Sequence, residues 1–155
     1  MKELNITFKE VLNGALGVGH RPKLKSLKAI KDQGVTHIWT LLSEREGALD
    51  IKSAVLGAGL EWIWLPLPNG KPPDKDKTSE ILDCFKDTET LLIDGARIYL
   101  HCSAGIHRTG LISYAFLRYL GFSGSDSLEK ITSMRRLTGE GVGEDRLNWG
   151  DVNFS

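Results

Sequence analysis

The sequence predicts an α/β fold, a three-layer sandwich in which a central, mainly parallel sheet of four or five strands is flanked by helices. Short β-branched and apolar segments alternate along the chain with longer segments whose apolar residues recur at helical spacing. Turns that contain glycine, proline or asparagine separate them. Ligands of such sheets bind beyond the carboxyl ends of the strands, so we expect a functional site at that edge.

Length and composition indicate one domain and limit the classes of partner. The 155 residues are enough for a single domain, residues 1–155, with one hydrophobic core. The 20 basic and 20 acidic side chains cancel, so we expect neither nucleic acid nor a membrane surface as a partner. Apolar runs are far shorter than the ~20 residues that cross a bilayer. The absence of a signal-peptide core at residues 1–5 and the two cysteines, too few for a disulfide framework, predict a reducing, cytoplasmic setting.

The first half of the chain alternates strands and helices. Lysines alternate with apolar residues over residues 23–33 as on a helix with one wet face, and Gly34 is a stop signal. The expected elements, in order, are an edge strand at 4–8, a short strand at 15–19, a helix at 23–33, a buried strand at 35–42, a loop or helix at 43–56 and a strand at 60–67.

The second half begins with a turn-rich segment, residues 68–77, which lies inside a single domain and is therefore expected to be a functional loop. Glycines over residues 139–143 predict a flexible loop. The other expected elements are a helix from 75 or 78 to about 94, a strand at 96–101, a helix at 109–120, a helix at 128–137 capped by Ser125 or Asp126, and a last turn or short helix at 144–149.

Residues 101–110 concentrate the chemistry of the chain, because Cys102 opens a tight loop between a strand and a helix and Arg108 closes it. Inward backbone N–H groups and a helix N-terminus favour an anion there, and they stabilise a thiolate. An arginine fork suits two phosphate oxygens. The pattern therefore predicts phosphate-ester hydrolysis, with Cys102 as nucleophile, Arg108 as phosphate ligand and a cysteinyl-phosphate as intermediate.

The order His101-Cys102, five residues, Arg108, Thr109-Gly110 resembles the signature loop of the cysteine-dependent protein tyrosine phosphatases, and most closely their compact dual-specificity branch. The resemblance implies no cofactor and no metal. It implies that His101 orders the loop and that Thr109 donates to the thiolate. It also implies backbone N–H groups that bind phosphate at Ser103, Ala104, Gly105, Ile106 and His107.

Two positions depart from this family's pattern. His107 stands where many relatives have glycine, which resembles atypical members that act on inositol phosphates; a plain exposed loop residue is the alternative. Asn69 stands where the resemblance places the aspartic general acid, and an amide cannot act as that acid. Asp74 is then the first candidate for the acid and Asp76 the second. Alternatively, the substrate has a leaving group that needs no acid, or the protein binds phosphate without turnover.

Glu144 lies near the place where relatives position the hydrolytic water, so it is a candidate base or substitute acid; a solvated helix-end residue is its alternative.

A zinc site at His101, Cys102 and His107 is disfavoured because adjacent ligands are geometrically awkward. A Cys–His hydrolase leaves Arg108 unexplained.

The predicted function is that of a phosphomonoester hydrolase acting on phosphotyrosine, with phosphoserine and phosphothreonine as further substrates. The expected partner is therefore a phosphorylated protein or a small phosphorylated molecule. Two alternatives remain open at this stage. One is a phosphatase of inositol phosphates or other non-protein phosphates, which Lys71, Lys75 and Lys77 would suit. The other is a pseudophosphatase that binds phosphorylated partners, which Asn69 would suit.

Overall fold

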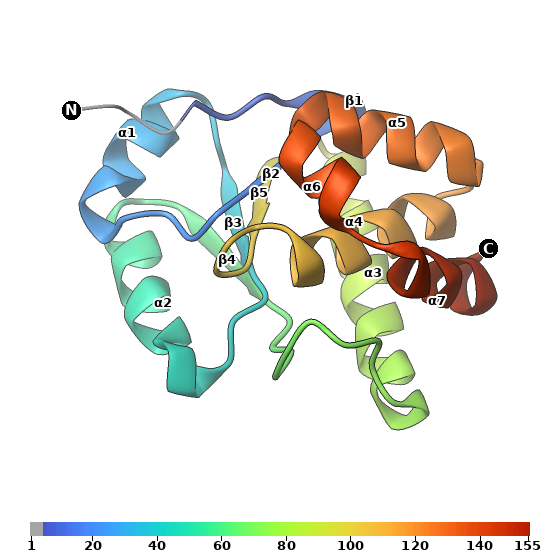
Figure 1. Cartoon of the computed structure of the whole chain (residues 1–155). Coiled ribbons are helices and arrows are strands. Elements are labelled where there is room, and N and C mark those ends of the chain that lie inside the picture. Colours follow the sequence, from blue (N-terminus) through green and yellow to red (C-terminus); the bar gives the residue numbers. More distant parts are fainter. Residues whose placement is uncertain (1–4) are drawn as a thin grey trace.

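The computed structural model describes residues 5–155 and contains one five-stranded sheet (Figure 1). The strand order is β1-β2-β5-β3-β4; β1 and β2 are antiparallel and all other neighbours are parallel. The strands are β1 Lys9–Val11, β2 Gly14–Gly19, β3 His37–Thr40, β4 Glu61–Trp64 and β5 Arg97–His101. The expected α/β fold with a mainly parallel sheet is thus confirmed.

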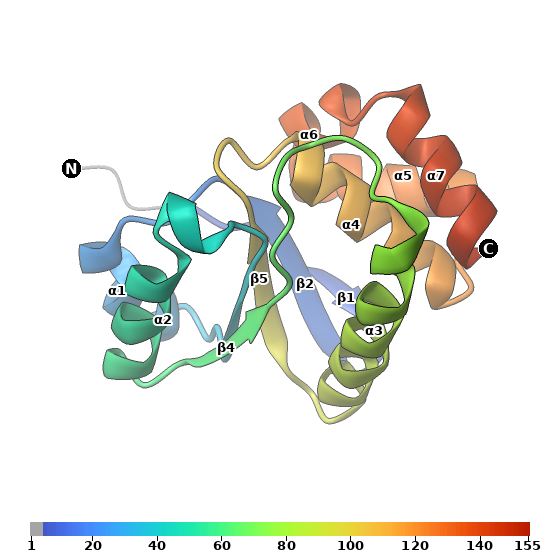
Figure 2. The same cartoon turned by 90° about the horizontal axis from the view of Figure 1, so that it is seen from below.

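Helices cover both faces of the sheet (Figure 2). One side carries α1 and α2, and the other carries α3, α4 and α5, with α7 packed on α4 and α6 on α5. The helices are α1 Leu27–Asp32, α2 Ala48–Gly57, α3 Thr78–Ile93, α4 His107–Tyr119, α5 Gly124–Met134, α6 Arg136–Gly141 and α7 Glu144–Phe154, with short 3₁₀ turns η1 Leu24–Ser26, η2 Glu44–Glu46 and η3 Lys75–Lys77. No helix in residues 5–155 is long and apolar enough to cross a bilayer.

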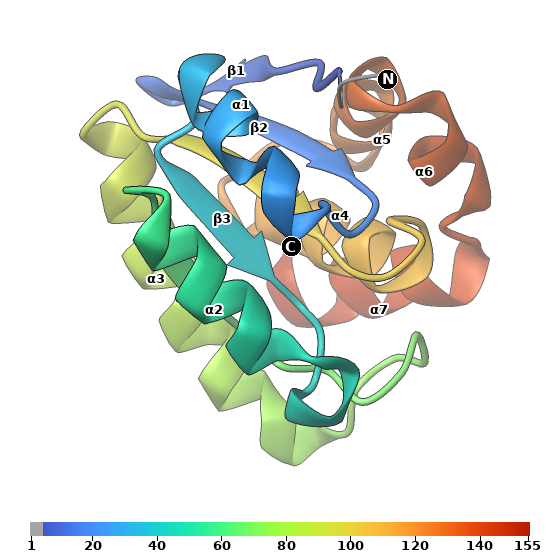
Figure 3. The same cartoon turned by 90° about the vertical axis from the view of Figure 1, so that its left-hand side faces the viewer.

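The core is centred on strands β5 and β3 and on helix α4, which crosses behind them (Figure 3). Nine consecutive residues of α4, from Thr109 to Leu117, are buried. Trp39 of β3 meets Phe116 of α4 edge to face at 5.5 Å, and Phe85 of α3 lies 5.1 Å from Phe116. This packing fixes the axis of α4, and therefore the position of its first turn beyond the end of β5.

The predicted edge strand at 4–8 is wrong for residues 5–8, while residue 4 lies outside the described part of the chain. The first strand is Lys9–Val11. Side chains of Ile6 and Phe8 lie over Gly17 instead, and Arg97 stacks on the Phe8 ring at 4.1 Å. Residues 5–8 therefore cover β2 rather than extend the sheet.

The predicted flexible loop at 139–143 is also wrong, because residues up to Gly141 belong to α6 and α7 begins at Glu144. A Cβ at Gly139 would collide with Thr132 of α5, so this glycine serves close helix packing rather than mobility. Gly143, with φ +87°, makes the turn between the helices. Helix α5 starts earlier than expected and is capped by Ser123, whose Oγ accepts from the Asp126 N–H, and not by Ser125 or Asp126.

Candidate active site

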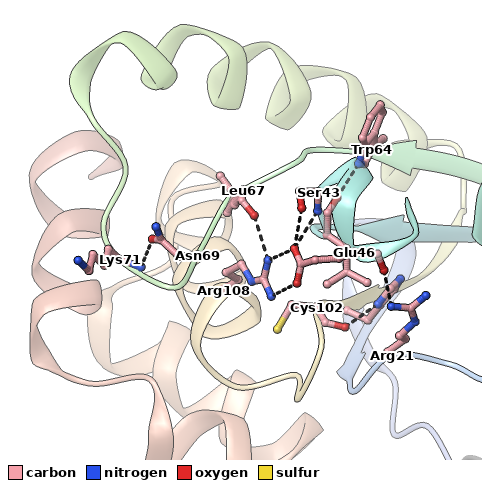
Figure 4. Close-up of polar contacts among 11 residues, drawn as sticks. Arg21, Ser43, Glu46, Trp64, Leu67, Asn69, Lys71, Cys102 and Arg108 are labelled. Carbon is pink, nitrogen blue, oxygen red and sulfur yellow. Dashed lines mark hydrogen bonds and ion pairs between the residues drawn. The ribbon is translucent and has the colours of Figure 1, made fainter. Parts of the chain in front are cut away.

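Cys102 directly follows β5, at the centre of the carboxyl edge of the sheet, and α4 begins at His107. We call residues 102–106 the Cys102 loop. Cys102 carries a free thiol and is 3% exposed. The helix begins two residues before the expected Thr109, and its N-cap residue is Ile106. The predicted strand–loop–helix unit is present and brings Cys102 and Arg108 together (Figure 4).

All carbonyls of the Cys102 loop have a partner outside the loop. Arg135 of the α5–α6 junction donates to two of them, at 3.1 Å and 3.0 Å, while Arg136 pairs with Glu140 on the surface. The five acceptors and their donors are Cys102 (His101 Nδ1), Ser103 (Arg21 N), Ala104 (Arg135), Gly105 (Arg135 and Thr138) and Ile106 (Gly110 N). Because a peptide's N–H points opposite to its C=O, the N–H groups that follow turn inward, as an anion-binding nest requires.

Among residues 5–155, oxygen acceptors bind Arg108 from one side only. Its Nη1 donates to Glu46 Oε1 at 2.7 Å and to the Leu67 carbonyl at 3.0 Å, and its Nη2 donates to Glu46 Oε2 at 2.9 Å (Figure 4). A guanidinium has five N–H donors, so Nε–H and one Nη2–H on the other edge have no oxygen acceptor within residues 5–155, and the Cys102 side chain is a neighbour of this guanidinium. The spacing of these two donors allows them to bind two phosphate oxygens at the same time.

The electrostatics of the pair follow from these contacts. The hydrogen bond from Arg108 lowers the pKa of Glu46 from 4.5 to about 2, against the opposing effect of burial. The same bond raises the pKa of Arg108, and the adjacent Cys102 side chain adds to this. The guanidinium and carboxylate are therefore both charged throughout the neutral range.

Glu46 was not among the predicted site residues. It closes a capping box in which Ser43 donates from its backbone N–H and its hydroxyl to Glu46 Oε1, both at 3.0 Å. Arg21 Nη1 donates to the Glu46 carbonyl at 2.5 Å. The Ser43-x-x-Glu46 spacing was a sequence signal for the turn, but not for a partner 62 residues away.

His101 and Thr109 flank the loop as buried polar groups. His101 Nδ1 donates to the Cys102 carbonyl at 2.9 Å, and burial lowers the pKa of His101 to about 4. Thr109 is fully buried, and its Oγ1 finds no hydrogen-bond partner among the described residues. A buried hydroxyl without a partner is costly unless a ligand or reaction intermediate uses it.

The segment 68–77, which we call the Asn69 loop, lies beside the first turns of α4 and α7. Arg108 binds the Leu67 carbonyl, and Arg146 of α7 donates from Nε to the Gly70 carbonyl at 2.6 Å. A Cβ on Gly70 would come within 2.9 Å of the exposed His107 side chain. Asn69 Oδ1 accepts from the Lys71 N–H at 2.9 Å, which closes a small turn at the tip (Figure 4).

The acidic candidates lie around this loop. Asp74 and Asp76 are exposed, and Asp74 precedes η3 without a side-chain capping bond. Both line a cavity of about 370 Å³ together with Leu67, Pro68, Asn69, Lys71, Pro72, Pro73 and Lys77, and none of these lining residues belongs to the Cys102 loop. Glu144 is exposed at the start of α7.

Cys84, the other cysteine, is half-buried in α3, and burial raises its pKa to about 12, so it is a weak nucleophile. Residues 5–155 contain no group of three or more His, Cys, Asp and Glu side chains placed to hold a metal ion.

Solved structures share this fold. Kinase associated phosphatase, with serine in place of its catalytic-site cysteine, has a TM-score of 0.74 at 18% identity over 96% of this chain and 93% of its own. PTPMT1 in complex with PI(5)P has a TM-score of 0.75 at 16% identity over 95% and 94%. TpbA of P. aeruginosa in complex with pTyr has a TM-score of 0.61 at 17% identity over 95% and 87%. At such identities the likeness shows the fold alone.

A comparison with protein-family models identifies the family, which the structural likeness alone does not. No match was found among curated proteins. The model described as "Tc-R-P: Polymorphic toxin system, DSP-PTPase phosphatase" matches residues 17–121, which include Glu46, the Asn69 loop, Cys102 and Arg108. The helices that carry Arg135 and Arg146 lie outside the match. The predicted resemblance is confirmed, and the chain belongs to this family of DSP-PTPase phosphatases.

Proposed function

We propose that the protein hydrolyses phosphomonoesters through a cysteinyl-phosphate on Cys102. One observation carries the proposal: the Cys102 loop has all its carbonyls bound from outside, while Arg108 keeps two N–H donors on the edge away from Glu46. Sulfur, inward N–H groups and a guanidinium edge thus surround one space. A tetrahedral phosphate dianion matches this set better than any other simple anion.

In the first step the Cys102 thiolate attacks phosphorus in line, so the S–P bond forms as the P–O bond to the leaving group breaks. Arg108 and the loop N–H groups hold the three equatorial oxygens. The leaving oxygen takes a proton from a carboxylic acid. In the second step water attacks phosphorus, the S–P bond breaks, and phosphate leaves. Water's proton returns to the carboxylate while the Thr109 hydroxyl donates to the departing thiolate.

We assign the proton to Asp74 first and Asp76 second. Both belong to the Asn69 loop, which Arg146 binds at the Gly70 carbonyl and which directly follows Leu67, whose carbonyl accepts from Arg108. The Asp74 carboxylate makes no capping bond that would restrain it. A movement of the loop is required to bring either group to the leaving oxygen.

Phosphotyrosine is the proposed substrate, with phosphoserine and phosphothreonine next; TpbA in complex with pTyr gives a precedent for the first in a protein of the same fold. A phosphorylated inositol is the second candidate. The exposed Lys71 and His107 and the half-buried Arg146 gather around Gly70, beside the Cys102 loop, and would suit a second phosphate. PTPMT1 with PI(5)P gives a precedent in the same fold.

The test is hydrolysis of an aryl and an alkyl phosphate from pH 5 to 8 by wild type, Cys102→Ser, Asp74→Asn and Asp76→Asn, with Cys84→Ser as the matched cysteine control. We expect Cys102→Ser to abolish turnover and Cys84→Ser to retain it. One aspartate variant should lose the basic limb of the pH profile and lose more activity on the alkyl ester, which has the poorer leaving group.

The pseudophosphatase alternative has its own outcome. Asn69 supports it, because it removes the acid from the expected position. Wild type would then bind vanadate without hydrolysing either ester. If turnover appears only in Asn69→Asp, the loop supports catalysis and the amide alone has silenced it.

A further inference from the structure

Three hydrogen bonds run in series from the sheet edge to the Cys102 loop. Trp62 Nε1 lies 2.9 Å from Thr40 Oγ1, Thr40 Oγ1 lies 2.8 Å from His101 Nε2, and His101 Nδ1 lies 2.9 Å from the Cys102 carbonyl. The strands β4, β3 and β5 are adjacent, and Thr40 is the register partner of His101. Thr40 and His101 are both fully buried.

The two ends of this series fix its direction. An indole N–H can only donate, and a backbone carbonyl can only accept. His101 must therefore carry its proton on Nδ1 to reach the carbonyl. With that proton in place and the ring neutral, Nε2 is an acceptor, so the Thr40 hydroxyl donates to it while accepting from Trp62. Every group in the series then has one permitted role.

We propose that Thr40 and Trp62 are positioning residues that hold His101 as the neutral Nδ1–H tautomer and so keep the Cys102 carbonyl turned away from the phosphate site. The inference rests on the proposed function in one respect, namely that Cys102 is the nucleophile. A carbonyl turned inward would place its negative end beside the thiolate and the phosphate oxygens. The series prevents this from a distance of two strands.

The surroundings of His101 support a neutral ring. Burial is the main cause of its lowered pKa; the hydrogen bond to the Cys102 carbonyl opposes this, and the nearby guanidinium groups of Arg21 and Arg108 act in the same direction as burial. A doubly protonated ring would have to donate Nε2–H to Thr40, which would deprive the buried Thr40 hydroxyl proton of its imidazole acceptor. Trp62 is itself held by stacking on Trp64 at 5.3 Å.

The sheet edge supplies a matched control. Trp64 Nε1 donates to the Leu42 carbonyl at 2.8 Å, outside the series. Trp62→Phe and Trp64→Phe therefore remove the same N–H from the same stacked pair, but only the first touches the series. Thr40→Val removes the hydroxyl with little change of shape, and Thr40→Ser keeps it.

Two measurements test the proposal without using turnover. Nitrogen-15 NMR of the imidazole reports the His101 tautomer, and the rate of Cys102 alkylation by iodoacetamide at pH 6 reports the share of thiolate. We expect the Nδ1–H tautomer in wild type and mixed tautomers in Thr40→Val. In that variant the rate of Cys102 alkylation should fall to about one third of the wild-type rate or below. Thr40→Ser should restore both. Trp62→Phe should shift both in the same direction, and Trp64→Phe should leave them unchanged.

The proposal is overturned if wild-type His101 carries its proton on Nε2. It is overturned equally if Thr40→Val, folded by circular dichroism, keeps the wild-type tautomer and alkylation rate. Should Thr40→Val fail to fold, identical results for Trp62→Phe and Trp64→Phe reject it. If Cys102→Ser retained phosphatase activity, the proposed function would fail while the tautomer result still decided the arrangement of the series.

Discussion

Gly105 shows how strongly a single residue constrains the Cys102 loop. Its φ is +74°, and a Cβ would collide with the backbone of Gly19 and His20 at the end of β2. Gly121 has φ +102° but open space where its Cβ would stand. The pair separates the cost of the backbone conformation from the cost of the collision.

We expect Gly121→Ala to lower the free energy of unfolding by about 1 kcal/mol, the cost of a left-handed conformation. Gly105→Ala adds a backbone collision, so we expect a loss of about 2 kcal/mol or more together with loss of vanadate binding. Urea unfolding and vanadate titration measure the two effects. Equal stability losses in the two variants would contradict the close approach of β2 to the loop.

At this scale the sequence identified the residues whose spacing is local. Cys102 and Arg108 stand six residues apart, at the start of one short loop and in the first turn of the helix that follows it, so their pairing could be read from local sequence. Glu46 could not be found in this way, because its contact with Arg108 depends on the order of β3 and β5 in the sheet. Asp74 remains a prediction, since its proposed role depends on a movement of the loop.

Among the elements, the Asn69 loop depends on a helix that the sequence barely indicated. Arg146, in the first turn of α7, binds the Gly70 carbonyl through Nε and the Val142 carbonyl through Nη1 at 2.8 Å. It thereby joins the loop to the α6–α7 junction. The glycines around residues 139–143 suggested flexibility, whereas tertiary contacts make them sites of close packing, which composition does not reveal.

Arg146→Met retains the length of the side chain and removes these bonds. We expect faster proteolytic cleavage in the Asn69 loop and about tenfold lower hydrolysis of an alkyl phosphate, because the acid is positioned less well. Arg136→Met is the control, since Arg136 binds Glu140 on the exposed side of α6. Cleavage at the wild-type rate in Arg146→Met would show that Arg108 alone holds the loop.

For the molecule as a whole, the alternation of strands and helices was sufficient to predict the fold class. The spacing of apolar residues in the sequence indicates each buried strand and each helix with an apolar face. The sheet order was not predictable, and it determines which side chains meet. It places β5 between β2 and β3, and so buries His101 and, in the adjacent strand, His37.

These two buried imidazoles should make stability depend on pH. Burial lowers the pKa of His101 from 6.5 to about 4 and lowers that of His37, where Glu61 opposes the effect. The unfolded chain therefore binds protons at a higher pH than the folded chain does. Stability is greatest above the unfolded pKa of about 6.5 and falls as the pH falls toward the folded values. For His101 alone the full loss is about 3 kcal/mol.

Urea unfolding at pH 7.5, 7, 6 and 5 measures this dependence. Glu46, whose pKa is also lowered, titrates below about 4.5 and so stays outside this window. We expect the free energy of unfolding of wild type to fall over these steps. For His101→Asn its slope against pH should be smaller, by an amount equivalent to close to one bound proton, because Asn has no proton to bind. A wild-type slope in His101→Asn would mean that His101 binds a proton as readily in the folded protein as in the unfolded chain, contrary to the neutral ring that the Trp62–Thr40 series requires.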